Sequence, residues 1–149
     1  LYDSPCNLFV AGFIGSPQMN FVDATCKVVG EKVYLVAGPS EIELPAAKGK
    51  KLIDGGYDGK TVVLGIRPED LHDEPEFLAK SPNTVIEATI RVYEMLGAEV
   101  YLYFDYEGAN MTARVDPRTT ARTGDTVKFA LDADKIHVFD KETEETITN

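Results

Sequence analysis

The glycine-rich segment from Asp54 to Thr61 is the strongest candidate for chemistry in this sequence, because it ends in Gly59-Lys60-Thr61. Phosphate-binding loops end in a similar triplet, in which backbone amides and the lysine hold the phosphates of a nucleotide. That pattern needs a glycine where Asp54 stands, and a helix after the loop whose first amides face the phosphates. Here the loop continues into Val62-Val63-Leu64, which is typical of a strand. We therefore interpret the segment as a turn between a helix and a strand.

The 25 acidic residues form several close pairs, which suggests acid–base catalysis. A catalytic pair needs one carboxylate in a dry site and one in a wet site, so that their pKa values separate. The pairs in this chain fall in charge-rich turns, where we expect both members to be solvated: Glu69 with Asp70, Asp132 with Asp134, and Glu142 with Glu144. We predict no catalytic residues, although an enzyme that uses one such pair stays an open hypothesis.

The histidines and cysteines form no catalytic or metal-binding pattern. His72 lies in an acidic stretch, His137 lies between two aliphatic residues, and no serine nucleophile motif accompanies either one. Two cysteines, Cys6 and Cys26, with two distant histidines do not have the spacing of a structural zinc site. The sequence predicts structural histidines, free thiols and no metal site.

Composition restricts the class of protein and its partners. The chain has 149 residues, 44% hydrophobic and 27% charged, which fits one globular domain or two very small ones. Its net charge of −10 should repel phosphate backbones and anionic lipids, so we predict no nucleic-acid partner. The uncharged stretch from Ser4 to Val22 is long enough for a membrane span, but its strongly apolar part runs only from Leu8 to Ile14. We predict a short docking helix there instead.

Alternating apolar and polar residues predict β-strands over most of the chain. The alternating runs are Val33–Ala37, Val62–Ile66, Ile86–Val92, Met111–Val115 and Val127–Leu131. The run Val100–Phe104 is continuously apolar or aromatic, which predicts a strand covered on both faces. Many short strands with little helix are typical of a small β-barrel.

Two helices and one exposed connection complete the predicted elements. Ser4-Pro5 is a favourable helix start, and Gly15-Ser16-Pro17 ends that helix after one aromatic face. A second short helix is predicted from Ala46 to Asp54. The acidic segment Glu69–Lys80 is predicted to be an exposed connection between two halves of the chain.

Four segments carry a resemblance to a known family. They are Asn7–Phe21, Gly65–Leu71, Leu96-Gly97-Ala98-Glu99 and His137-Val138-Phe139-Asp140. In this order and at these spacings they resemble the C-terminal part of the ATP-binding subunits of maltose and multiple-sugar ABC importers. The family usually has Thr-Gly near its C-terminal turn, whereas Thr143 is followed here by Glu144.

The resemblance implies a mainly β, OB-type small barrel, the transport-associated domain, with an N-terminal helix and one short helix. Residues 1–17 would be the helix and join from a missing nucleotide-binding domain, and residues 18–149 the regulatory barrel. The start at Leu1, without methionine, is consistent with an excised piece. ATP and magnesium would bind in the missing domain, so no cofactor is expected in this chain, which lacks the Leu-Ser-Gly-Gly-Gln signature and should not hydrolyse ATP.

The implied function is non-catalytic: the barrel would hold two ATPase subunits together and offer a surface to regulators. The candidate regulatory or dimer-interface residues are Gly65, Arg67, Pro68, Glu69, Glu94 and Gly97. The candidate contacts to the nucleotide-binding domain are Phe9, Phe13, Ile14 and Met19. Arg67-Pro68 is equally typical of an ordinary strand end with a rigid turn, so its recognition role stays open.

The implied partners are a second copy of the barrel, the nucleotide-binding domain of the same subunit, and a regulator from the phosphotransferase system. The protein would be cytoplasmic and would reach the inner face of the membrane only through the transporter complex. The alternative is a small-ligand sensor barrel for an oxyanion or a sugar, although a net charge of −10 makes oxyanions poor ligands unless a basic pocket exists.

Overall fold

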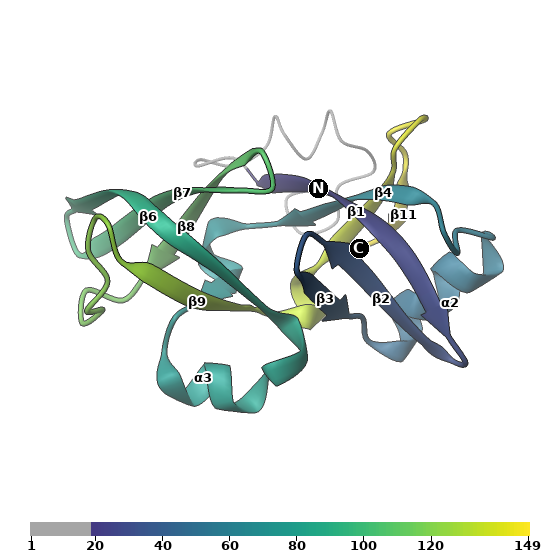
Figure 1. Cartoon of the computed structure of the whole chain (residues 1–149), viewed down its shortest axis with the longest axis horizontal. Coiled ribbons are helices and arrows are strands. Elements are labelled where there is room, and N and C mark those ends of the chain that lie inside the picture. The colour runs from purple at the N-terminus through teal and green to yellow at the C-terminus, as the bar shows by residue number, and fades with distance from the viewer. Residues whose placement is uncertain (1–18) are drawn as a thin grey trace.

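The computed structural model describes residues 19–149, which form two antiparallel sheets and two short α-helices (Figure 1). The predicted N-terminal helix, with Phe9, Phe13 and Ile14, lies outside the described residues, and so does the predicted boundary after residue 17. Every strand pairing within the described residues is antiparallel, which suits a chain of short, one-sided strands.

The first sheet has six strands in the order β11-β10-β4-β1-β2-β3. Their bounds are β1 Asn20–Val29, β2 Lys32–Ala37, β3 Ser40–Glu43, β4 Thr61–Ile66, β10 His137–Asp140 and β11 Thr146–Thr148. The C-terminal strands thus lie beside β4 from the first half of the chain, as the yellow and teal ribbons of Figure 1 show. This pairing brings His137 opposite Gly65.

The second sheet has five strands in the order β5-β9-β6-β7-β8. Their bounds are β5 Leu71–His72, β6 Val85–Leu96, β7 Glu99–Tyr106, β8 Ala109–Val115 and β9 Thr126–Leu131. A register shift between Ile90 and Val92 interrupts the pairing of β6 with β7. Such a bulge bends the strand, and beyond it β6 no longer contributes fully buried residues.

One apolar core joins the two sheets. It takes alternate residues of β1, β2 and β4 from one sheet and of β6, β7, β8 and β9 from the other. Within it the rings of Phe104 in β7 and Phe129 in β9 stack with centroids 4.9 Å apart. The hydroxyl of Tyr106 donates a 2.6 Å hydrogen bond to the carbonyl oxygen of Ala37, which ties β7 to the end of β2.

Asn20 at the start of β1 also links the sheets, and it does so with its side chain. Its Nδ2 donates to the carbonyl oxygen of Thr112 in β8, and the Thr112 N–H donates to its Oδ1, both at 2.8 Å. The amide therefore imitates a neighbouring strand at the free edge of β8. Because both partners on Thr112 are backbone groups, Asn20 satisfies donors and acceptors that burial would otherwise leave unpaired.

The helix α2 spans Ala46–Asp54, as the sequence predicts, and the glycine-rich segment after it is a turn that leads directly into β4. Gly56 and Gly59 have φ of 72° and 81°, a region that favours glycine, so they explain why this turn is glycine-rich. The predicted turn between a helix and a strand is confirmed.

The segment of residues 69–80, predicted to be an exposed connection, contains regular elements, and Leu71 within it is buried. These elements are the 3₁₀ helix η1 (Pro68–Asp70), β5, and a helix α3 (Pro75–Lys80) that the sequence reading did not include. Pro68 and Pro75 each occupy the first turn of a helix, where a missing N–H costs nothing. His72 stacks on Phe77 of α3 with ring centroids 4.0 Å apart, which holds the helix against the sheet.

The prediction that Val100–Phe104 is covered on both faces was wrong. Val100, Leu102 and Phe104 face the core, whereas Tyr101 and Tyr103 face outward and are half-buried. Tyrosine carries an apolar ring and a polar hydroxyl, so it can occupy a solvent-facing position within an apparently apolar run. The strand covered on both faces is β4, where Val63 packs on the side opposite the core with Met19 and Phe139.

Candidate functional site

The first group of predicted interface residues lies at the end of β4 and in η1. Arg67 and Pro68 are buried, and Arg67 Nη1 lies 3.2 Å from Nε2 of His137 in β10. The guanidinium therefore points into the molecule. The structure places Arg67 as a link between η1 and β10, which is compatible with the strand-end interpretation of Arg67-Pro68.

The hydrogen bonds of His137 define its tautomer. A guanidinium has only donors, so Nε2 of His137 accepts from Arg67 and the ring proton is on Nδ1. Nδ1–H then donates to Oδ1 of Asn149 at 3.0 Å. Burial lowers the pKa of His137, and the nearby cations Arg67, Lys48 and Lys135 lower it further. The hydrogen bond to Asn149 raises this pKa but does not outweigh the other effects. We call Arg67, His137 and Asn149 the polar joint.

Charged groups from three further elements surround the polar joint. Lys48 of α2 is buried, and burial lowers the pKa of its ammonium group, while the carboxylate of Asp134 opposes that shift. Asp70 in η1 has its pKa raised to about 6 by burial, with smaller contributions from Glu69 and Asp132. The prediction that both Glu69 and Asp70 are solvated was therefore wrong for Asp70, because its backbone accepts from the Asp132 N–H and holds it against β9.

Gly65 has a packing reason to be glycine. A Cβ at this position would lie 2.7 Å from Sδ of Met19 and 3.0 Å from a ring carbon of Phe139. Met19 is itself 5% exposed and belongs to the small cluster with Val63 and Phe139. The predicted role of Met19 in contacting another domain, and that of Gly65 in an interface, stay predictions, but both residues pack inside the described chain.

The second predicted group, Glu94 and Gly97, lies on the hairpin that joins β6 to β7. Gly97 has a φ of 61°, which its place in the tight turn requires. Three of the five large apolar side chains that are exposed among residues 19–149 lie on this hairpin, namely Val92, Met95 and Leu96. Val92 and Leu96 lie on the outer face of the hairpin and Met95 on the opposite face. Grouped exposed apolar side chains of this kind suggest a contact surface, whereas single ones scattered over a protein do not.

The outer face of this hairpin and of β8 forms a surface that we call the hairpin platform. Its members share one face because β6, β7 and β8 pair in register; they are Val92, Glu94, Leu96, Tyr101, Tyr103, Thr112 and Arg114. Tyr103 donates a 3.0 Å hydrogen bond to Oε1 of Glu94, and Arg114 Nε lies 3.8 Å from Oε2 of Glu99. Sequence reasoning selected Glu94 but missed the tyrosines and Arg114, which the alternation in 111–115 could have revealed as outward-facing.

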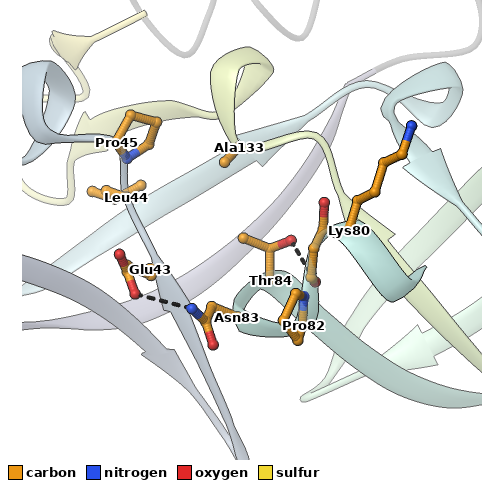
Figure 2. Close-up of a pocket in the computed structure, with 9 residues that line it drawn as sticks. Glu43, Leu44, Pro45, Lys80, Pro82, Asn83, Thr84 and Ala133 are labelled. Carbon is orange, nitrogen blue, oxygen red and sulfur yellow. Dashed lines mark hydrogen bonds between the residues drawn. The ribbon is translucent and has the colours of Figure 1, made fainter. Parts of the chain in front are cut away.

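A shallow pocket of about 250 Å³ lies between the end of β3 and the start of β6 (Figure 2). Asn83 Nδ2 donates to Oε1 of Glu43 at 3.3 Å across it, while the Lys80 side chain extends away from that pair. Thr84 Oγ1 donates to the carbonyl oxygen of Leu131 at 2.9 Å. The pocket combines donors and acceptors, so it suits a neutral hydroxylated ligand better than an oxyanion.

The other candidates for chemistry are the cysteines and a possible metal site. Burial raises the pKa of the Cys26 thiol to about 11, so this free cysteine is inert; Cys6 lies outside residues 19–149. Within the same residues no cluster of three or more histidine, cysteine or acidic side chains is arranged to hold a metal ion. None of the helices among them is long and apolar enough to cross a membrane.

Comparison with known families gives two overlapping matches. Residues 15–71 match the MalK OB fold domain, and residues 64–139, more than half of the chain, match the TOBE domain. The chain belongs to the TOBE domain family. The predicted mainly β, OB-type fold is thereby confirmed, with α3 as an addition to it.

Curated relatives of this TOBE domain are ATP-binding proteins of transporters. It is 41% identical over 97% of its length to the oligosaccharides import ATP-binding protein MsmX of Bacillus subtilis. It is 36% identical over 99% of its length to the trehalose/maltose import ATP-binding protein MalK of Thermococcus litoralis, and 38% identical over 99% to the multiple sugar-binding transport ATP-binding protein MsmK of Streptococcus mutans. The chain spans 38%, 39% and 38% of these three proteins.

One solved structure resembles the TOBE domain in fold. The cytoplasmic molybdate-binding protein ModG superposes with a TM-score of 0.57 over 84% of this chain and 96% of that one. Because the sequences are 13% identical, this likeness concerns the fold alone.

Proposed function

We propose that this TOBE domain is the non-catalytic regulatory and pairing region of the ATP-binding subunit of a sugar-import ABC transporter. The observation that carries the proposal is the coverage: nearly the whole chain aligns with importer ATP-binding proteins, yet it spans only about two-fifths of each. The parent subunit would then bind ATP and magnesium in its remaining part, and it would lie on the cytoplasmic face of the membrane through the transporter.

Pairing of the domains would act through effective concentration. Two ATPase domains must separate and close in each cycle, and a pair of TOBE domains that stays in contact makes each closure an intramolecular step. A regulator, such as a protein of the phosphotransferase system, that binds one TOBE domain and the opposite ATPase domain would hold the open state. Its effect is limited to its differential affinity for the two states.

The structure supports a scaffold role in two ways. The polar joint links the start of η1 to β10 and to the C-terminal residue through side-chain hydrogen bonds. The hairpin platform leaves apolar side chains exposed, which suits a surface that contacts another protein.

The test uses the parent subunit with and without residues 19–149. Light scattering without nucleotide should find the complete subunit as a dimer and the truncated subunit as a monomer, while both still bind ATP. Reconstituted transport should fall with the loss of pairing. A truncated subunit that dimerises and transports like the complete one would contradict the proposal.

The sensor alternative has one observation in its favour, the polar pocket of Figure 2. Calorimetric titration of the chain with maltose, trehalose, sulfate and molybdate separates the two functions. Binding of a sugar that Asn83→Leu abolishes would support a sensor, whereas no heat with any of these compounds would leave pairing as the function.

A further inference from the structure

The imidazole of His137 is buried, and each of its ring nitrogens makes one of the hydrogen bonds of the polar joint. Nε2 accepts from Arg67 Nη1 at 3.2 Å, and Nδ1–H donates to Asn149 Oδ1 at 3.0 Å. A ring that is protonated on both nitrogens still donates to Asn149, but it has no lone pair left for Arg67. Protonation places an N–H group against a guanidinium that offers only donors. The contact between Arg67 and His137 therefore exists only while the ring is neutral.

The backbone at Arg67 is held independently of this contact. Arg67 has a φ of −77° and a ψ of 152°, the extended conformation that a residue before proline prefers, and Pro68 follows it. The carbonyl oxygen of Arg67 accepts the N–H of Asp70 at 2.9 Å. Neither restraint involves the guanidinium. Rotation about the side-chain torsions of Arg67 can thus break the contact with His137 while η1 keeps its position.

The charged groups that surround His137 come from three elements packed near β10: η1, α2 and η3 (Ala133–Lys135). One cation precedes or lies on each of them, namely Arg67, Lys48 and Lys135. The carboxylates that act on these elements are Glu69, Asp70, Asp132 and Asp134. The strands on either side of β10, β4 and β11, contain no charged residue.

Acidification changes two of these groups in the same direction. Asp70 has a pKa of about 6, so its carboxylate is neutralised as the pH falls through that value and its attraction for Arg67 is lost. The pKa of His137 is lowered, chiefly by burial, so the ring gains its positive charge below pH 6.5. On the acidic side of neutrality the guanidinium of Arg67 therefore loses an anion and meets a new cation.

We propose that the polar joint is an acid-operated latch, in which protonation of His137 expels the Arg67 guanidinium from its buried position to the surface while the two sheets stay folded. At neutral pH the latch is closed and Arg67 ties the start of η1 to β10. In acid the corner between β4 and η1 presents a mobile cation. Any recognition that uses Arg67 becomes dependent on pH, and this inference does not rest on the proposed pairing function.

Nuclear magnetic resonance on the 149-residue chain tests the latch during a titration from pH 7.5 to pH 4.5. Nitrogen-15 shifts report the tautomer and charge of the His137 ring, and nitrogen-15 relaxation reports the order parameter of Arg67 Nε. At pH 7.5 the ring proton should be on Nδ1, and the order parameter should be about 0.85, as in a rigid group. It should fall below about 0.6 with the same midpoint as the protonation of His137.

Two internal references accompany this titration. Arg91, whose side chain is 52% exposed, should have an order parameter below about 0.6 throughout. The backbone amide spectrum should stay dispersed across the pH range, which shows that the sheets remain folded. A spectrum that collapses before or together with the release of Arg67 would overturn the inference, because the event would then be unfolding.

His137→Gln removes the titration but keeps a side-chain oxygen that can accept from Arg67. Arg67 should stay ordered over the whole pH range in this variant. His72→Gln is the matched control: it removes the other histidine of the chain, which stacks on Phe77 instead, and should leave the release of Arg67 unchanged. The titration of the wild-type chain decides the question by itself if His137→Gln folds poorly.

Asp70→Asn distinguishes the two titrating groups. Arg67 should stay ordered at pH 7.5 in this variant, because neutral His137 still accepts its hydrogen bond, and it should be released at lower pH. Release already at pH 7.5 would identify the charge of Asp70 as the trigger and would overturn the inference.

Two results in the wild-type chain would also overturn it. One is an Arg67 side chain that stays ordered after His137 is fully protonated. The other is a neutral ring with its proton on Nε2, because that tautomer cannot accept from the guanidinium. Release of Arg67 in folded His137→Gln, at the same pH as in wild type, would have the same meaning.

Discussion

Glu144 illustrates how a single residue can carry backbone strain. It has a φ of 63° in the turn between β10 and β11, where the Asp140 carboxylate accepts the N–H groups of Glu142 and Thr143, both at 2.8 Å. A non-glycine residue in this region is disfavoured by roughly 1 kcal/mol. The position is the one at which the resembled family usually has glycine, so the departure seen in the sequence is a strained one.

Glu144→Gly should therefore raise the free energy of unfolding by about 0.5 kcal/mol, since relief of strain exceeds the added flexibility of the unfolded chain. Urea unfolding at pH 7 measures the change. Glu142→Gly is the control: its φ is not positive, so the same substitution should lower the stability. Equal effects of the two variants would contradict the strain argument.

The titrations of Asp70 and His137 make the free energy of unfolding depend on pH in opposite directions. The folded pKa of Asp70 is about 6, above its value of 3.8 in an unfolded chain, so the folded state binds its proton more tightly. The stability from that proton is fully present below pH 3.8 and is lost as the pH rises through about 6. The pKa of His137 is lowered, so its contribution is present at neutral pH and is lost as the pH falls below 6.5.

Asp70→Asn separates these two contributions. The variant should be more stable than wild type at pH 7, by about 1 kcal/mol after allowance for the partial exposure of the carboxyl group. The difference should shrink to nothing by about pH 4, where the wild-type carboxyl group is protonated in the folded state. Thermal unfolding at several pH values between these limits is the measurement, and a gain that does not change with pH would contradict the assignment.

At the scale of elements, the two hydrogen bonds of Asn20 to Thr112 join β1 to the edge of β8. Asn20→Ala should lower the free energy of unfolding by about 2 kcal/mol, because it leaves a backbone donor and acceptor without partners. Hydrogen exchange at the Thr112 amide should accelerate more than at other amides of β8. Asn110→Ala, on the same strand and exposed, should change the stability by less than about 0.5 kcal/mol.

The elements also show what a sequence can reveal. The strands with regular alternation, such as β6 and β8, and the helix α2 between its proline and glycine boundaries, were predictable because local patterns specify them. The long strand β1 was overlooked, although Val22 to Val28 alternates, and the short strand β10 was not identified because its four residues are too few to show a period. The polar joint and the Asn20 contact were hidden for a different reason: they join residues 70 and 92 positions apart.

For the whole molecule, the net charge of −10 opposes association of two copies. Salt screens this repulsion over a Debye length of about 8 Å at physiological ionic strength, whereas ion pairs that are buried in a contact are screened less. Self-association should therefore strengthen as sodium chloride rises from low to physiological concentration. Sedimentation equilibrium at several salt concentrations measures this change. Association that weakens from the lowest salt concentration onward would contradict the expectation and would indicate attraction between exposed charges.

The free edges of both sheets have a consequence for colloidal behaviour. The edge strands β11, β3 and β5 have only three, four and two residues, and on the longer edge strand β8 the side chain of Asn20 occupies the backbone groups of Thr112. Strands of other molecules therefore find few unpaired backbone groups with which they could extend a sheet into a fibril. Removal of the Asn20 side-chain amide would expose the two backbone groups of Thr112 on the longest edge strand. The alanine variant should therefore bind thioflavin T on prolonged incubation under conditions in which the wild-type protein stays clear.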